Sequence, residues 1–281
     1  GEISVRTTEY TLLAKSLHPL PEKFHGLQDT DTRYRQRYLD LMMNPESKKV
    51  FTMRSAIVRE MRNVLHEQDF MEVETPILNV IPGGAAARPF VTHHNALDLD
   101  LYLRIAPELY LKQLIVGGYE KVFEIGRTFR NEGISTKHNP EFTMLELYQA
   151  WTDYHGMMDL TENLIREVAS RVRDGELQIE WQGHSIDLDQ PFQRLTMTEA
   201  VKQAKGVDFA EIRTLEEAKA EAEEAKIGVD PMWGRGDILN AFFEAFCEDT
   251  LIQPTFIMDY PFEISPLSKS KPGDSQMTER F

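Results

Sequence analysis

The chain has 281 residues, of which 41% are hydrophobic and 27% are charged, as expected for a globular protein with one large core or two smaller ones. No apolar run reaches the roughly 18 residues that a membrane-spanning helix requires. The formal net charge of −15 excludes a protein that coats nucleic acid along its length, although a local basic patch could still hold an RNA.

The cellular setting is indicated by two further features. Cys247 is the only cysteine, so an intramolecular disulfide is impossible and a reducing compartment is favoured. Residues 1–4 do not resemble a signal peptide, and we expect a cytoplasmic protein. Because residue 1 is not Met, we also expect the chain to begin inside a longer protein.

The first forty residues predict a strand and then a helix. Short alternating segments over residues 2–17 end at Pro19 and Pro21, which predicts the tail of a small β-domain followed by a linker. Residues 33–41 read RYRQRYLDL, and such a charge run predicts a helix with a solvated, salt-bridged face. We place none of its arginines in a binding site.

A long helix and a strand follow. Apolar side chains recur every three or four residues over 47–68, which predicts an amphipathic helix. Residues 70–78 predict a strand with Pro76 late in it. Because proline cannot donate to a strand ladder, this strand should lie at a sheet edge or an interface.

The next segment carries a glycine pair, two histidines and a short helix. Gly83 and Gly84 let backbone approach a ligand, although most such pairs are simply turns. His93 and His94 lack further ligands at metal-binding spacing, so we predict no metal site. Residues 101–105 predict a strand. Pro107 and Glu108 then suit the first turn of a helix that ends at Gly117.

The central stretch predicts a long antiparallel hairpin. Residues 122–130 and 141–150 both alternate, and the residues between them are rich in turn formers. The second strand carries Phe142, Glu146 and Tyr148 on one face. This face is either half-buried with one odd charge, or the floor of a pocket for a cation, because a buried carboxylate needs a positive partner.

The remaining elements are mainly helical. We expect helices over 157–172, from Leu195, and over 214–227, where Thr214 and Glu217 form a capping box. Cys247 lies in an apolar helical run and should be a buried structural thiol. The other expectations are a hairpin over 179–188, a strand over 254–261 and a polar loop over 269–275.

Several of these stretches resemble one known family. Residues 129–132 (FRNE) and 138–143 (HNPEFT), followed by Glu146 and Tyr148, resemble motif 2 of the class II aminoacyl-tRNA synthetases, a strand–loop–strand that binds ATP. Residues 47–78 resemble motif 1, the homodimer interface, with Asp69 where the family usually has glycine. Residues 81–98 and 104–109 resemble the lysyl members of the subgroup that also contains the aspartyl and asparaginyl enzymes. The resemblance covers nearly the whole chain.

The resemblance implies an α/β (α+β) fold, in which an antiparallel β-sheet is flanked by helices. It implies that residues 1–20 are the end of an N-terminal anticodon-binding OB-fold with its linker, and that residues 21–281 are the catalytic domain. About 207–251 would be a helical insertion. The family's third motif and its magnesium-binding carboxylates do not occur before Phe281, so we expect a catalytic domain that is incomplete at its C-terminus.

The implied activity is that of a lysine–tRNA ligase, which activates lysine with ATP and Mg²⁺ and transfers it to tRNA(Lys). Arg130 carries over as the catalytic residue, because its fork can bridge the lysine carboxylate and the α-phosphate. We expect no metal ligands in the chain. The implied ATP-binding residues are Arg130, Glu132, His138 and Phe142. The implied lysine-binding residues are Gly84, Glu108, Arg130, Glu146 and Tyr148.

Two other functions stay open at this stage. One is a paralogue that lysylates a protein, of the elongation-factor-P type, which lacks an OB-fold. The other is a non-catalytic module that keeps dimer or partner contacts. The OB-like residues 1–17 favour the tRNA enzyme, and the intact motif 2 favours a nucleotide site. We expect that these residues alone do not aminoacylate tRNA.

Overall fold

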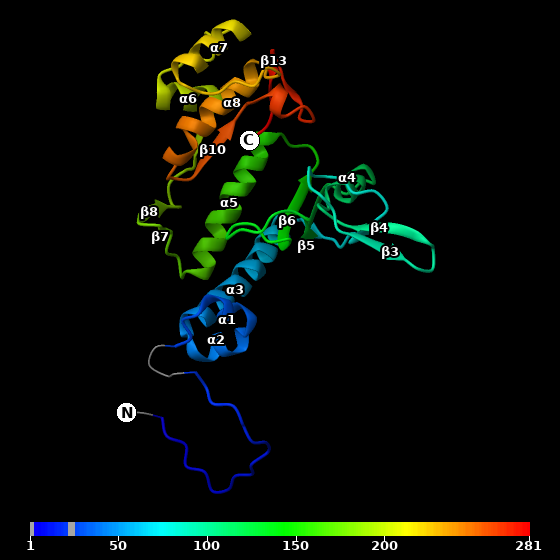
Figure 1. Cartoon of the computed structure of the whole chain (residues 1–281), viewed down its shortest axis with the longest axis vertical. Coiled ribbons are helices and arrows are strands. Elements are labelled where there is room, and N and C mark those ends of the chain that lie inside the picture. The colour runs from blue at the N-terminus through cyan, green and yellow to red at the C-terminus, as the bar shows by residue number, and fades with distance from the viewer. Residues whose placement is uncertain (1–2, 22–25) are drawn as a thin grey trace. The chain divides into compact units, whose positions relative to one another are not determined.

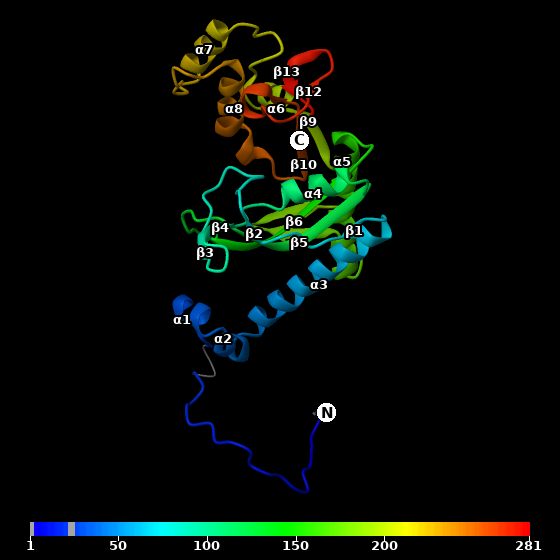
Figure 2. The ribbon, with the colours of Figure 1, turned by 90° about the vertical axis from the view of Figure 1, so that its right-hand side faces the viewer.

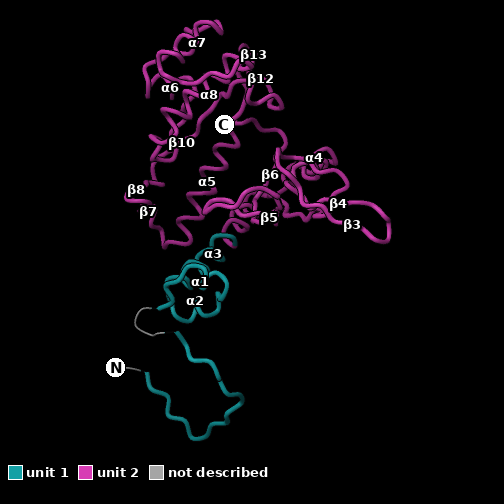
Figure 3. Tube along the Cα trace, in the orientation of Figure 1, with its two compact units in different colours: residues 1–58 teal, residues 59–281 magenta. Residues whose placement is uncertain are grey.

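The computed structural model describes residues 3–21 and 26–281. It divides into two compact units, Gly1–Val58 and Arg59–Phe281, which Figure 3 colours separately. The helix α3 (Pro45–Glu67) begins in the first unit and ends in the second. In the described part of the chain, no helix is both long and apolar enough to cross a membrane.

The first unit differs from the sequence prediction at its start. Residues 3–21 contain no helix or strand, and residues 3–20 are all exposed, so the strand predicted within 2–17 is wrong. A strand needs a neighbour to pair its backbone groups, and the described part of this unit offers only helices. Those helices are α1 (Thr30–Arg35), α2 (Arg37–Met43) and the start of α3.

The charge run within 33–41 has the predicted solvated, salt-bridged face, where Arg35 pairs with Asp31 at 2.7 Å, and it also pairs two arginines with one buried carboxylate. Asp40 is fully buried, and Arg33 donates to it from Nε at 2.7 Å while Arg37 donates to its other oxygen. Asn44 donates to Asp40 as well, at 2.7 Å. Hydrogen bonds from Asn44, Arg33 and Arg37 hold the pKa of the Asp40 carboxyl well below its usual range.

The second unit is built around the predicted hairpin. Strands β5 (Lys121–Phe129) and β6 (Glu141–Gln149) pair antiparallel over nine residues each, from Lys121 opposite Gln149 to Phe129 opposite Glu141. The two-residue strand β1 (Met71–Glu72) adds to β5 in parallel. On one face Phe123 packs against His66 of α3, with the rings 5.4 Å apart, and α4 (Glu108–Val116) covers the other face (Figure 2).

A second small sheet joins the hairpin. Its strand order is β2 (Leu78–Asn79), β4 (Leu99–Leu103) and β3 (Val91–His94), all antiparallel. The single strand predicted over 70–78 is therefore two short strands in different sheets, β1 and β2, with Pro76 between them. Both are edge strands, as proline requires. Pro107 is the N-cap of α4, one position earlier than predicted.

The C-terminal half groups helices around a second core (Figure 1). Met197 of α6, Phe242 of α8 and Ile257 of β10 all belong to this core, so the predicted insertion at about 207–251 packs directly onto its flanks. The elements are α5 (Tyr154–Val172), β7 (Gln178–Trp181), β8 (His184–Asp187), β9 (Gln193–Thr196), α6 (Met197–Lys205), α7 (Leu215–Glu224), α8 (Arg235–Phe246), η1 (Glu248–Thr250), β10 (Thr255–Met258), β11 (Tyr260–Pro261), η2 (Phe262–Ile264), β12 (Ser270–Lys271) and β13 (Asp274–Thr278).

Most of the elements predicted for this half from short sequence patterns agree with the structure. The capping box of Thr214 and Glu217 starts α7, and Cys247 is 1% exposed, with burial raising the pKa of its thiol. Three expectations were wrong. The strand predicted over 254–261 is two strands in different sheets, β10 and β11. Leu195 belongs to β9, which pairs in parallel with β10, and the helix starts two residues later. The stretch 269–275 is not a loop, since it contains β12 and the start of β13, which pair as a hairpin.

Candidate active site

The strand pairing decides which side chains share a face of the hairpin. Glu124 lies opposite Glu146, and Thr128 lies opposite Phe142, so these four side chains point to the same side of the sheet. Tyr148 points the same way, two residues after Glu146. The candidate site therefore lies on the face that α4 covers, away from α3.

A cavity of about 690 Å³ lies at the loop end of the hairpin, where β5 connects to β6. It contains all four residues predicted to bind ATP, three of them from the β5–β6 connection and one from the start of β6. Its size suits a nucleotide-sized ligand. The lining residues are Arg130, Glu132, Gly133, Ser135, Thr136, Lys137, His138, Asn139 and Phe142.

Arg130 is one of two basic side chains that line this cavity, with Lys137. Its guanidinium carbon lies 5.3 Å from the centre of the Phe142 ring, and its Nε donates to the Ile105 carbonyl at 3.4 Å. Among the described residues, no carboxylate lies within ion-pair distance of it. The remaining donors of the guanidinium are thus available to an anion.

Glu132 and His138 are held by local hydrogen bonds. Glu132 accepts from the backbone nitrogen of Arg88 at 3.2 Å through Oε1. His138 Nδ1 lies 2.8 Å from Ser135 Oγ, which also accepts from the backbone nitrogens of Lys137 and His138. The connection between the strands is exposed, but Ser135 organises it as a turn.

A second group of predicted residues, Glu108, Glu146 and Tyr148, does not line the cavity but lies beside it. Tyr148 donates to Glu146 at 3.1 Å. Burial raises the pKa of Glu146; the Tyr148 bond opposes this, and the charge of Glu108 adds to it. Burial, then the charges of Glu146 and Glu108, also raise the pKa of Tyr148 well above its usual range.

Arg130 links the two groups. Its positive charge, like that of Arg104, lowers the pKa of Glu146, so the arginine of the cavity and the carboxylates beside it act on one another. Glu108 itself is paired with Lys112 one turn along α4, at 2.6 Å. Three acidic or phenolic groups beside one unpaired guanidinium can hold a ligand that carries both an ammonium and an anion.

Gly84 lies against Glu108. Its φ is +87°, and a Cβ there would be 2.9 Å from Cβ of Glu108 and 3.2 Å from Cβ of Ala106. Both the left-handed backbone and the close approach require glycine. The structure thus brings the Gly84 backbone next to the predicted ammonium-binding carboxylate.

A buried ion pair that was not predicted from the sequence lies beneath this site. Arg104 Nη1 donates to Glu124 Oε1 at 2.5 Å, with side chains only 3% and 4% exposed. Thr75 donates from Oγ1 to the other oxygen of Glu124 at 2.6 Å. The sequence contained a signal for this pair. By alternation Glu124 lies on the same strand face as Arg130, and a carboxylate buried there requires a positive partner.

Arg104 also connects the two sheets. Its backbone nitrogen donates to Ile77 at 2.8 Å, its carbonyl accepts from Phe129 at 2.9 Å, and its Nε donates to the Arg127 carbonyl at 2.8 Å. Gly126 makes room for it, because a Cβ at that position would overlap the Arg104 guanidinium. Arg104 directly precedes Ile105, whose carbonyl accepts from Arg130, so it fixes the segment that leads to Glu108.

His93 lies between two carboxylates. His93 contacts Asp100 through Nδ1 at 3.0 Å and Asp98 through Nε2 at 3.3 Å. Across residues 3–21 and 26–281, no group of three or more His, Cys, Asp or Glu side chains could hold a metal ion.

Comparison with known proteins identifies the family. Residues 29–281 match the family of class II tRNA synthetases (D, K and N). The chain belongs to this family. The family membership and the α/β class inferred from motif 2 are therefore confirmed.

Individual proteins of this family give a more specific comparison. The chain is 59% identical over all 281 residues to the lysine–tRNA ligases of Staphylococcus aureus strains Mu3 and COL, and 58% identical to that of strain MW2. The chain spans 57% of the length of each of these relatives.

Proposed function

We propose that this chain is the part of a lysine–tRNA ligase that binds ATP and lysine. In the proposed reaction, lysine and ATP give lysyl-adenylate and pyrophosphate, and the lysyl group then passes to tRNA(Lys). The proposal is supported by lysine–tRNA ligases at 59% identity that match the chain along its whole length. The same relatives favour the tRNA enzyme over a protein-lysylating paralogue.

The position of Arg130 is the main structural support for the proposal. It lies against Phe142 at the end of a 690 Å³ cavity, has no carboxylate partner among the described residues, and acts on Glu146 beside it. The lysine carboxylate and the α-phosphate of ATP are both anions and repel each other. A guanidinium between them offsets this repulsion as attack begins and presents two parallel donors, which an ammonium cannot.

The other cavity residues have matching roles in the proposal. Phe142 offers a ring face for adenine, on the side that Arg130 leaves open. Glu132 has one carboxylate oxygen on the Arg88 backbone and its second oxygen free of any hydrogen bond in the described structure, which suits the adenine amino group. His138, in the exposed turn, would contact the γ-phosphate.

Lysine would bind beside the cavity, next to α4. Glu108 and the Gly84 backbone would hold the α-ammonium, while Glu146 and Tyr148 would face the side-chain ammonium. A cation bound there favours the ionised form of Glu146, which burial disfavours in the free protein. A neutral competitor would leave these groups unpaired, which gives selectivity.

The proposal extends to the family's other properties. We infer a cytoplasmic protein that dimerises through α3 and the segment around Pro76, where Val50, Phe51 and Met53 expose apolar surface. Residues 1–20 would end an anticodon-binding domain. The described residues offer no cluster of carboxylates for Mg²⁺, so no step is assigned to a metal held by this chain.

Calorimetry on the 281-residue chain tests the proposal. ATP should bind, and Arg130→Ala should weaken it by about 10- to 100-fold, the value of a charge-assisted bond of about 1.5–3 kcal/mol. Arg127→Ala is the matched control, because Arg127 is an exposed arginine of β5, three residues before Arg130, that faces the other side of the sheet and pairs with Glu141. Equal ATP binding by both variants would contradict the role of Arg130. ATP–pyrophosphate exchange is expected to be absent from this chain alone.

A further inference from the structure

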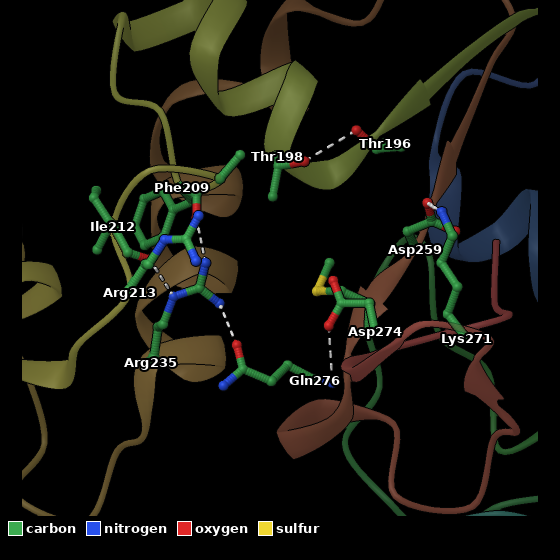
Figure 4. Close-up of a pocket in the computed structure, with 12 residues that line it drawn as sticks. Thr196, Thr198, Phe209, Ile212, Arg213, Arg235, Asp259, Lys271, Asp274 and Gln276 are labelled. Carbon is green, nitrogen blue, oxygen red and sulfur yellow. Dashed lines mark hydrogen bonds and ion pairs between the residues drawn. The ribbon is translucent and has the colours of Figure 1, made fainter.

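A second cavity, of about 540 Å³, lies in the C-terminal half, far along the chain from motif 2 (Figure 4). It is enclosed by the loop before α7, the start of α8, the β9–α6 junction and the β12–β13 hairpin. Its lining residues are Thr196, Thr198, Phe209, Ala210, Ile212, Arg213, Arg235, Asp259, Lys271, Asp274, Gln276 and Met277. The proposed active site uses none of them.

Some charged side chains around this cavity form ion pairs and others do not. Lys271 forms an ion pair with Asp259, whose other oxygen accepts from Tyr154 at 2.9 Å, so that pair is neutral. Arg213 and Arg235 lie on the opposite side in Figure 4. Neither arginine has a carboxylate within ion-pair distance among the described residues, and Asp274 is the one remaining acidic side chain in the lining.

Arg235 is fixed but not neutralised. Its Nε donates to the Ile212 carbonyl at 2.7 Å, its Nη2 donates to the Phe209 carbonyl, and its Nη1 lies 3.4 Å from the Gln276 amide oxygen. Carbonyl oxygens orient the guanidinium without cancelling its charge. Arg213 is exposed, and no carboxylate lies within ion-pair distance of its guanidinium in the described structure, although its charge helps to lower the pKa of Glu217, which accepts from the Arg213 backbone nitrogen. The cavity therefore has one rigid and one adaptable cation.

Most arginines in the described structure behave differently. Arg62, Arg171 and Arg194, for example, each pair with a carboxylate within 3 Å, as expected in a chain of net charge −15. Arg130 is an exception, and it lines the cavity proposed for ATP. Two neighbouring guanidiniums without acidic partners repel each other, and an anion between them removes that cost. The second cavity shares this feature with the first.

We propose that the Arg213–Arg235 cavity binds a phosphate group. Arg235 supplies the oriented donor, and Arg213 closes over the anion. The phosphate is either free or part of an RNA backbone, and only the RNA source rests on the proposed function. Because the chain is strongly acidic, a polyanion can approach it only at such local positive sites.

Phosphorus NMR with inorganic phosphate and the 281-residue chain tests the site. The bound-phosphate broadening should fall at least tenfold in Arg213→Glu, which leaves the fold intact because Arg213 is exposed and its side chain makes no hydrogen bond in the described structure. Lys219→Glu is the matched control, since Lys219 is an exposed cation of α7 outside the cavity. Arg130→Ala should retain the Arg213-dependent signal. Equal broadening in the Arg213 and Lys219 variants would overturn the site.

A second arm distinguishes the two phosphate sources. Binding of a short RNA hairpin is measured against salt for the unchanged chain, Arg213→Ala and Lys219→Ala. An RNA-backbone site predicts that Arg213→Ala alone lowers the slope of log K against log salt by about 1. An unchanged slope, with the phosphate signal still dependent on Arg213, assigns the site to free phosphate. Loss of ATP binding without loss of that signal would refute the proposed function and not this site.

Discussion

Glu146 shows how one half-buried residue ties the proposed lysine site to pH. Burial raises its pKa above the ordinary value of 4.5, so the folded protein holds this proton more tightly than the unfolded chain does. The groups that face it are Tyr148 on its own strand, Glu124 and Arg130 from the paired strand and its end, Glu108 from α4, and Arg104. The net result is a carboxylate whose ionisation costs stability until a cation binds.

This gives a prediction with a definite sign. As pH rises from 4.5 through the raised folded pKa, Glu146 loses a proton that the folded state prefers, so its contribution to the free energy of unfolding falls. Glu146→Gln removes that loss. Urea unfolding across this pH range should show the variant gaining stability relative to the unchanged protein as pH rises.

The control for this prediction is Glu141→Gln, which alters an exposed carboxylate of the same strand. Its stability difference from the unchanged protein should not grow with pH in the same window. If the Glu146→Gln difference is also flat with pH, then burial does not shift this group and the carboxylate is free to ionise without a ligand. Lysine affinity should rise over the same pH range in the unchanged protein, because the ionised carboxylate is the form that pairs with an ammonium.

At the scale of elements, the Arg104–Glu124 pair is the joint between two sheets. Arg104 closes the backbone ladder between the β2–β4 sheet and the end of β5, and its side chain reaches Glu124 in the middle of β5. Removing one partner of a buried pair leaves an unpaired buried charge, which is more damaging than removing both. Each partner of the pair therefore requires the other, because either charge left alone would destabilise the contact between the two sheets.

Arg104→Met should lower the free energy of unfolding by about 3–5 kcal/mol, and the double variant Arg104→Met, Glu124→Leu should recover much of it. Urea denaturation measures both. The matched control is Arg171→Met, which breaks the bidentate pair with Glu67 on the surface and should cost about 0–1 kcal/mol. A double variant that is as unstable as the single one would show that Arg104 acts through its bonds to carbonyls and not through Glu124.

The elements that the sequence predicted well have signals that are complete within a few residues. The period of two in β5 and β6 and the capping box at Thr214 specify structure without any distant partner. The elements it missed depend on partners far along the chain. Glu124 needs Arg104, β9 needs β10, and Lys271 becomes part of a strand because β13 lies beside it.

The candidate site follows the same rule at the scale of the whole molecule. Motif spacing grouped Arg130, Glu132, His138 and Phe142, which are close along the chain, and the structure places them in one cavity. Motif spacing could not reveal the Arg213–Arg235 cavity, because its lining residues are spread along the chain from Thr196 to Met277. The sequence also does not show which arginines lack an ion-pair partner, and this is the feature that distinguishes the cavity. The alternation in residues 2–17 gave a wrong prediction because an alternating sequence forms a strand only where a neighbouring strand can pair with it.

The exposed N-terminal stretch gives a prediction for the whole chain. Residues 3–20 are exposed and lack helix and strand, whereas Arg104 is 3% exposed within the joint between the sheets. Trypsin should therefore cleave after Arg6 and Lys15 long before it cleaves after Arg104, because proteases act on accessible, unpaired backbone. Mass spectrometry of a time course gives the order of cleavage.

Removal of this stretch should change the free energy of unfolding of the remaining chain by no more than about 0.5 kcal/mol, the range of changes at exposed positions. ATP affinity should be unchanged, because no residue before Arg130 lines the 690 Å³ cavity. The control is the unchanged chain incubated without protease. If Lys15 resists cleavage as long as Arg104, the stretch is packed and its exposure here is wrong; if its loss destabilises the rest by several kcal/mol, it belongs to the fold that carries the site.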